Sequence, residues 1–165
     1  MLVLGVDPGL ATMGYGLVCE TTGGLQAVDY GVVTTSPNIP LPQRLQQLYR
    51  ELSDLVAKHQ PDEGAMEELF FSRNVRTAMS VGQARGVALL ALADAGLPVT
   101  DYTPLTIKQA VSGFGAADKI QMQTTVKLLL RLDSLPNPDD AADALAVAIC
   151  HLHSARLNTL LRDNQ

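Results

Sequence analysis

Four acidic side chains stand beside or inside apolar segments of this sequence, and their placement limits the folds that the chain can adopt. They are Asp7, Glu67, Asp140 and Asp143. Asp7 ends the apolar run 2–6, and Asp143 lies within the apolar stretch 141–149. A buried carboxylate is costly to desolvate unless it is paired, hydrogen-bonded or bound to a cation. We therefore expect a fold that gathers several of these acids around a shared cation.

The order of the apolar patterns predicts an α/β fold. Apolar runs bounded by turn residues predict strands at residues 2–6, 14–19, 25–34, 64–66 and 98–102. Helical spacing of apolar residues predicts helices at residues 41–58, 75–95, 104–111, 118–132 and 138–157. Short turns make the first three strands an antiparallel meander, and the later strands alternate with helices. This order predicts a five-stranded mixed sheet with helices on both faces.

The length of the chain, 165 residues, fits one domain. We expect this domain at residues 1–157, followed by a C-terminal tail at 158–165. Cys19 and Cys150 lie in apolar settings without CxxC spacing, which favours free buried thiols over a structural zinc site. The first residues lack a basic region and a cleavage site, and no segment reaches transmembrane length. These features predict a cytoplasmic protein.

The predicted topology brings the acids to one edge of the sheet. Binding sites in open α/β sheets collect outside the ends of the strands. Asp7 on a central strand and Glu67 on its neighbour can therefore converge there, and the helix that begins near Pro138 can bring Asp140 and Asp143.

Some of these acids have other interpretations. Asp139 and Asp140 follow Asn137 and Pro138, a pattern typical of a capped helix start with acids in its first turn. Asp143 is less easily explained in this way, because alanines surround it on a helix that can approach the sheet closely.

The strand end near Glu67 leaves a second alternative open. Glu67 could be a solvated residue, and Glu68 is an equal candidate for the site, since alternate residues of a strand face opposite sides. Similarly, the segment at Asp7, Pro8 and Gly9 could be an ordinary turn.

Four carboxylates at one place would make an all-oxygen site. Such a site suits Mg²⁺ or Mn²⁺ rather than zinc. Two of these ions about 4 Å apart can activate a water molecule and stabilise the leaving oxygen in phosphodiester hydrolysis.

The charge distribution bears on whether nucleic acid is the substrate. The net charge of −5 is unfavourable for phosphate binding. Residues 71–131, however, contain seven basic and three acidic residues, a local charge of +4. This segment could hold a phosphate backbone, or its bases could be scattered solvated surface.

Five motifs occur in an order that resembles the RuvC family of Holliday-junction resolvases. They are Gly5-Val6-Asp7-Pro8-Gly9 with Gly14-Tyr15-Gly16, Glu67 to Phe70 with Asn74, Gly82-Gln83-Ala84-Arg85-Gly86, the set Lys108, Val111, Gly113, Gly115 and Lys119, and Asp140-Ala141-Ala142-Asp143-Ala144-Leu145-Ala146. The resemblance covers nearly the whole chain. It implies a ribonuclease-H-like fold, a homodimer and symmetric cutting of two strands of a four-way DNA junction with Mg²⁺ or Mn²⁺. It also implies work in recombination and repair, with branch-migration partners of the RuvA/RuvB type.

The resemblance also implies roles for individual residues. Asp7, Glu67, Asp140 and Asp143 match the metal-binding catalytic carboxylates of the family, which favours Glu67 over Glu68. Five further residues are candidates for DNA binding: Phe70, Arg73, Arg76, Lys108 and Lys119. Phe70 matches an aromatic residue that meets junction bases, and the two lysines match family lysines near the site.

These DNA-binding assignments have alternatives in the sequence. Phe70 could be a core residue beside Phe71, and Lys108 or Lys119 could be plain surface. The predicted helix at 75–95 is apolar over much of its circumference, which fits core packing or the dimer interface of the family.

Two features of the sequence depart from the pattern of the family. Asp139 adds a fifth carboxylate, and residues 154–165 at the C-terminal end carry only Arg156 and Arg162 as bases. Two other classes of protein are alternatives to this family. The turn at Asp7 also resembles the phosphate-binding strands of actin-like ATPases and sugar kinases. Those proteins need two lobes around the nucleotide, and 165 residues leave no room for a second lobe. A non-catalytic junction-binding protein is the other alternative, and it would have no use for four converging acids.

Overall fold

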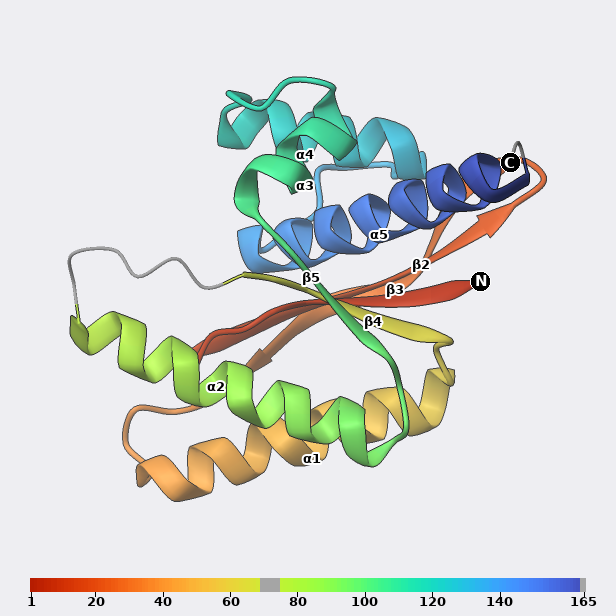
Figure 1. Cartoon of the computed structure of the whole chain (residues 1–165). Helices are drawn as coiled ribbons and strands as arrows, with labels where there is room; N and C mark the ends of the chain where they lie inside the picture. Colours follow the sequence, from red (N-terminus) through yellow and green to blue (C-terminus); the bar gives the residue numbers. More distant parts are fainter. Residues whose placement is uncertain (69–74, 164–165) are drawn as a thin grey trace.

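The computed structural model describes residues 1–68 and 75–163, with side chains at 1–68 and 78–155 (Figure 1). The strands are β1 (Leu2–Asp7), β2 (Thr12–Thr21), β3 (Gly24–Thr34), β4 (Glu63–Glu67) and β5 (Val99–Tyr102). The helices are α1 (Leu41–His59), α2 (Val75–Asp94), α3 (Pro104–Ser112), α4 (Lys119–Leu130) and α5 (Asp139–Asp163). The predicted order of strands and helices is confirmed.

The sheet is mixed, as predicted. Its five strands have the order β3-β2-β1-β4-β5. β1 pairs with β2, and β2 with β3, in antiparallel fashion, while β1 pairs with β4, and β4 with β5, in parallel. Because β1 and β4 are parallel neighbours, their last residues, Asp7 and Glu67, reach the same edge of the sheet.

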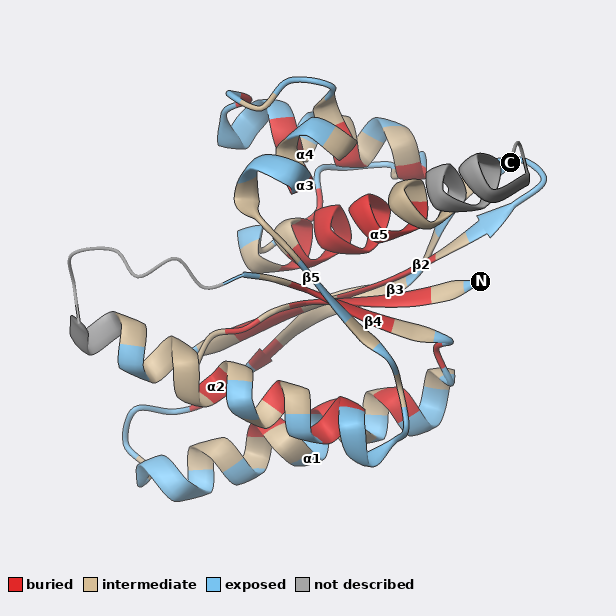
Figure 2. Ribbon diagram, in the orientation of Figure 1, coloured by how far each residue is buried: buried red, intermediate tan, exposed pale blue. Residues whose placement is uncertain are grey.

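Helices cover both faces of the sheet. α1 and α2 lie on one face, and α3, α4 and α5 lie on the other (Figure 1). Each face has its own apolar core: Leu4, Leu48 and Leu92 belong to one, and Val3, Val126 and Ile149 to the other. The middle of α5 is buried over most of its surface, since α3 and α4 cover the side that the sheet does not (Figure 2).

Small residues let α5 lie directly on the strands. On the helix, Ala141 and Ala144 are fully buried. On the sheet, a Cβ at Gly5 would overlap the backbone oxygen of Ala144, and a Cβ at Gly14 would overlap that of Asp140. The small residues of the helix were recognised from the sequence. The packing role of the matching glycines on the strands is seen only in the fold. This close packing carries the start of α5 to the end of β1.

The last helix differs from its prediction at both ends. The helix begins at Asp139, one residue after the predicted start, and the Ala141 N–H donates to the carbonyl of Pro138 at 3.0 Å. At the other end, helical backbone continues to Asp163, past the predicted end at Leu157. Residues 158–163 contain no proline or glycine that would stop it.

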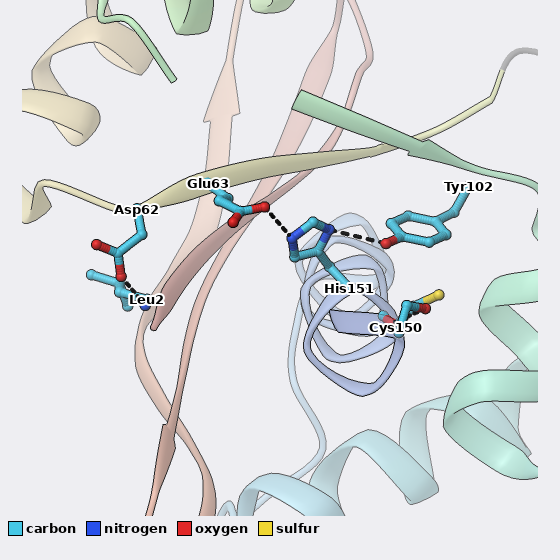
Figure 3. Close-up of polar contacts among 7 residues, drawn as sticks. Leu2, Asp62, Glu63, Tyr102, Cys150 and His151 are labelled. Carbon is cyan, nitrogen blue, oxygen red and sulfur yellow. Dashed lines mark hydrogen bonds and ion pairs between the residues drawn. The ribbon is translucent and has the colours of Figure 1, made fainter. Parts of the chain in front are cut away.

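A buried histidine ties α5 to the sheet (Figure 3). His151 is 4% exposed, its Nε2 lies 2.8 Å from a carboxylate oxygen of Glu63, and its Nδ1 lies 3.0 Å from the hydroxyl of Tyr102. A carboxylate only accepts hydrogen bonds, so Nε2 carries a proton. Both ring nitrogens are therefore satisfied, as a buried polar group requires.

The expectation of free buried thiols holds in full for Cys150 and in part for Cys19. Cys19 and Cys150 are both free thiols, although Cys19 is only half-buried. Among the described helices, none combines the length and the apolar character needed to cross a lipid bilayer.

Candidate active site

Asp7 is the most perturbed of the four acids. It is half-buried at the end of β1. The pKa of Asp7 is raised from 3.8 to about 7. Burial is the largest cause, the charges of Asp143, Asp140 and Glu67 add to it in that order, and Lys119 opposes them. One end of the central strand therefore gathers the four predicted acids into one interacting group.

Glu67, rather than Glu68, belongs to this group. Burial raises the pKa of Glu67, and the charge of Asp143 adds to this effect while Lys108 opposes it. Glu68 is exposed, and its backbone N–H donates to the carbonyl of Tyr102 at 2.8 Å. The parallel pairing of β4 with β1 decides which of the two neighbours lies beside Asp7.

The first turns of α5 supply the other two acids. Asp140 lies against the backbone of β2 at Gly14, which pairs with Asp7 in the sheet. Burial raises the pKa of Asp143, Lys119 lowers it, and the charges of Asp140 and Asp139 raise it. Asp140 and Asp143 on α5 therefore add negative charge at the same edge of the sheet.

A hollow of about 160 Å³ opens beside these acids. Its lining combines two acids, two lysines and apolar residues of α3, α4 and α5: Glu67, Pro104, Ile107, Lys108, Lys119, Met122, Asp143, Ala146 and Val147. Lys108 and Lys119, predicted to meet DNA, therefore line the same hollow as Glu67 and Asp143.

Asp139, the unexplained fifth carboxylate, pairs with a lysine of this hollow. Its Oδ2 lies 2.8 Å from the Nζ of Lys119, and its Oδ1 accepts a hydrogen bond from Gln123 at 2.6 Å. The hydrogen bond to Asp139 is the largest cause of a raised pKa at Lys119. Lys119 is the first residue of α4, where the helix dipole disfavours a cation. Asp139 compensates for this placement and holds the lysine beside the hollow.

Arg85 supports the site from α2, a role that the sequence analysis did not assign. Its Nη1 donates to the backbone oxygen of Glu67 at 3.0 Å, and its Nη2 pairs with Asp101 at 2.5 Å. The side chain of Arg85 is 12% exposed. A cation so deeply buried is rarely plain surface. The available signal was an arginine within an otherwise apolar helix segment.

The donor chemistry of the site fits a hard divalent cation. All four acids offer oxygen ligands. The pKa of Asp7 is raised first by burial and then by the three other acids, and Lys119 offsets these effects only in part. As the described side chains stand, no three His, Cys, Asp or Glu residues are close enough together to enclose a metal ion. The acids thus form one electrostatic group without a closed set of ligands.

Three of the predicted DNA-binding side chains cannot be placed. Phe70 and Arg73 lie outside the described residues, and Arg76 belongs to the first turn of α2 without a described side chain.

Comparison with known proteins identifies the family. The profile of the family "Crossover junction endodeoxyribonuclease RuvC" matches residues 3–151. The chain belongs to the RuvC family. A relative of that name from Syntrophomonas wolfei is 53% identical over 99% of this chain and 95% of its own length. Another from Chloroflexus aggregans is 58% identical over 94% of both chains.

A solved structure of a RuvC protein confirms the fold. The structure of Thermus thermophilus RuvC in complex with a Holliday junction substrate matches with a TM-score of 0.91 and 36% identity, over 96% of this chain and 97% of that one. The predicted ribonuclease-H-like fold, with its five-stranded mixed sheet, is therefore confirmed.

Proposed function

We propose that this chain is a crossover junction endodeoxyribonuclease, which resolves Holliday junctions by paired symmetric nicks in recombination and DNA repair. Membership of the RuvC family supports this activity. The observation that carries the chemistry is the interaction of Asp7 with three further acids at one end of the sheet. We place the nuclease domain at residues 1–157.

The four acids Asp7, Glu67, Asp140 and Asp143 would hold the divalent cations, two Mg²⁺ or Mn²⁺ ions in each site. When bound, such ions activate a water molecule and stabilise the leaving oxygen of the phosphodiester. The burial that raises the pKa values of Asp7, Glu67 and Asp143 disfavours their anionic forms in the free protein, so cation binding would be coupled to loss of protons.

Basic side chains would hold the DNA against these acids. Lys108 and Lys119 line the hollow beside Glu67 and Asp143, where each could bind a backbone phosphate. Phe70, Arg73 and Arg76 are the remaining proposed DNA contacts, with Phe70 stacking on junction bases.

A homodimer would supply one site for each of the two strands to be cut. Met79 and Leu90 on α2 are 64% and 53% exposed, and such apolar side chains suit an interface between two copies. We also propose association with a RuvA/RuvB-type branch-migration complex. The free thiols Cys19 and Cys150 fit a reducing cytoplasm as the location.

The test is nicking of a synthetic four-way junction, compared with linear duplex, across a titration of Mg²⁺ and of Mn²⁺. We expect junction-selective cutting by the wild type, and no metal-dependent cutting by Asp7→Asn or Glu67→Gln, with junction binding largely intact. Glu68→Gln is the matched control, because Glu68 is the exposed neighbour, and it should cut normally.

Two results would reject parts of this proposal. Wild-type rates in Asp7→Asn would remove the assignment of the acids. A wild type that binds junctions but cuts none in either metal would favour the alternative of a non-catalytic junction-binding protein.

A further inference from the structure

A second hollow, of about 450 Å³, adjoins the four acids. It is lined by the turn after β1, by α1, by α2 and by one acid of α5: Gly9, Leu10, Ala11, Thr12, Arg44, Ser80, Val81 and Asp140. None of these residues lines the hollow of Lys108 and Lys119. The acids are thus shared between two hollows, since Asp140 lines this one while Glu67 and Asp143 line the other.

Arg44 is fixed in place on the wall of this second hollow. Its Nε donates to the hydroxyl of Thr35 at 2.8 Å, and that hydroxyl donates to the carbonyl of Leu10 at 2.5 Å. The backbone N–H of Thr35 donates to the carbonyl of Ala11 at 3.0 Å, and Thr35 is only 6% exposed. A buried threonine therefore anchors the half-buried guanidinium to the turn that follows Asp7. Little further ordering would be needed for this cation to bind a ligand.

No described residue forms an ion pair that would neutralise the charge of Arg44. In the described part of the chain, no carboxylate lies within salt-bridge distance of its guanidinium. Apart from Asp140, the other residues that line the hollow are uncharged. A guanidinium presents a planar set of N–H donors that matches phosphate geometry. An anchored arginine with unpaired charge, in a hollow beside a candidate phosphodiesterase site, is suited to a phosphate.

We propose that this second hollow binds a backbone phosphate of the junction DNA through Arg44. The inference rests on the proposed function and extends it, because the acids would then have a cationic phosphate contact in each adjoining hollow. Lys108 and Lys119 serve the first hollow, and Arg44 serves the second.

The test measures junction affinity without divalent metal as a function of salt concentration. Arg44→Gln should weaken binding about fivefold, and the slope of log K against log salt should become shallower by about 0.9, as expected for the loss of one phosphate contact. Arg44→Lys keeps the charge, so it should bind with intermediate affinity and an unchanged slope. This lysine variant also decides the question if Arg44→Gln does not fold, as judged by circular dichroism and thermal unfolding.

Two control variants separate charge from structure. Thr35→Val removes the anchor but keeps the cation, so it should lower thermal stability and leave the salt slope unchanged. Arg50→Gln removes an exposed charge from the same helix at a residue that lines neither hollow, and it should change affinity by less than about twofold. Equal affinities and slopes for Arg44→Gln and Arg50→Gln would overturn the proposal. A shallower slope in Thr35→Val equal to that of Arg44→Gln would overturn it as well.

Inorganic phosphate distinguishes a DNA phosphate from a free anion. Stabilisation of the wild type by phosphate, absent in Arg44→Gln and accompanied by unchanged junction affinity, would assign free phosphate and overturn the DNA subsite. Failure of the wild type to bind or cut junctions would reject the proposed function together with this inference. If the wild type cuts junctions while Arg44→Gln binds them with wild-type affinity and slope, only the subsite is rejected.

Discussion

After burial, Asp143 is the largest cause of the raised pKa of Asp7. The two residues come from opposite ends of the chain and meet where α5 crosses the end of β1. Their repulsion should make the stability of the metal-free protein depend on pH. An acid whose pKa is higher in the folded state binds its proton more tightly there, so stability is retained at low pH and lost as the pH rises.

For Asp7 this loss falls between pH 3.8, its ordinary pKa, and about 7, its pKa in the fold. One unit of pKa corresponds to about 1.4 kcal/mol. Above this pH range, ionised Asp7 therefore lowers the free energy of unfolding by at most about 4 kcal/mol. Asp7→Asn should therefore be more stable than the metal-free wild type at pH 8, and the difference should vanish near pH 4. Chemical denaturation in EDTA at both pH values measures it. Equal stability of the two proteins at pH 8 would contradict a raised pKa of Asp7 in the folded protein.

Asp139→Asn should test whether Asp139 orients Lys119. The amide can still accept the hydrogen bond from Gln123 but cannot form the ion pair with Lys119. Exposed ion pairs contribute about 0.2–1 kcal/mol, so cleavage should fall by up to about fivefold, with junction affinity little changed. Single-turnover cleavage and equilibrium binding measure the two effects. In a Lys119→Met background the same substitution should have no further effect. An equal loss in both backgrounds would show that Asp139 acts without Lys119.

Arg85→Gln should lower both stability and cleavage. It removes the donor to the backbone of Glu67 and leaves Asp101 without its partner, which should destabilise the fold by about 1–3 kcal/mol. Cleavage should fall well below wild type at temperatures where the variant is folded, because Glu67 loses a fixed backbone position. Thermal unfolding and a nicking assay at saturating metal measure these effects.

The matched control for Arg85 is Asp101→Asn. This variant breaks the ion pair but leaves the hydrogen bond from Arg85 to Glu67. It should therefore cut at nearly the wild-type rate. If Asp101→Asn loses as much cleavage as Arg85→Gln, the contribution of Arg85 lies in the ion pair and not in positioning Glu67.

Gly14→Ala should displace the start of α5. The added Cβ would overlap the backbone oxygen of Asp140, so the helix or the strand must move. We expect a loss of about 1–3 kcal/mol in stability, as for other overpacked sites, and a large loss of cleavage, since Asp140 and Asp143 would move away from Asp7. The control is Gly86→Ala on α2, where a Cβ meets nothing within 4 Å. That change should stabilise the helix by about 0.5–1 kcal/mol. Normal cleavage by Gly14→Ala would argue against close packing as the means of placing the acids.

Much of the fold was predictable because the decisive patterns are local. Apolar runs of strand length, helical spacing and turn residues identified the strands, the helices and their order, and the short early turns implied the meander. The end of α5 was misjudged because a helix can continue through polar residues when nothing breaks it. Asp7 and Asp143 stood out in the same local way, as charges within apolar segments.

Other features depend on contacts between residues far apart in the sequence, which local patterns do not encode. The choice of Glu67 over Glu68 rests on the pairing of β4 with β1, and the partner of Asp139 on the packing of α4 against α5. The anchoring of Arg44 by Thr35 and the support of Glu67 by Arg85 likewise join separate elements. The sequence alone therefore determined which elements form and which acids are costly to bury. Only the tertiary structure decided which cations meet those acids, because charges interact through space and their distances are set by packing.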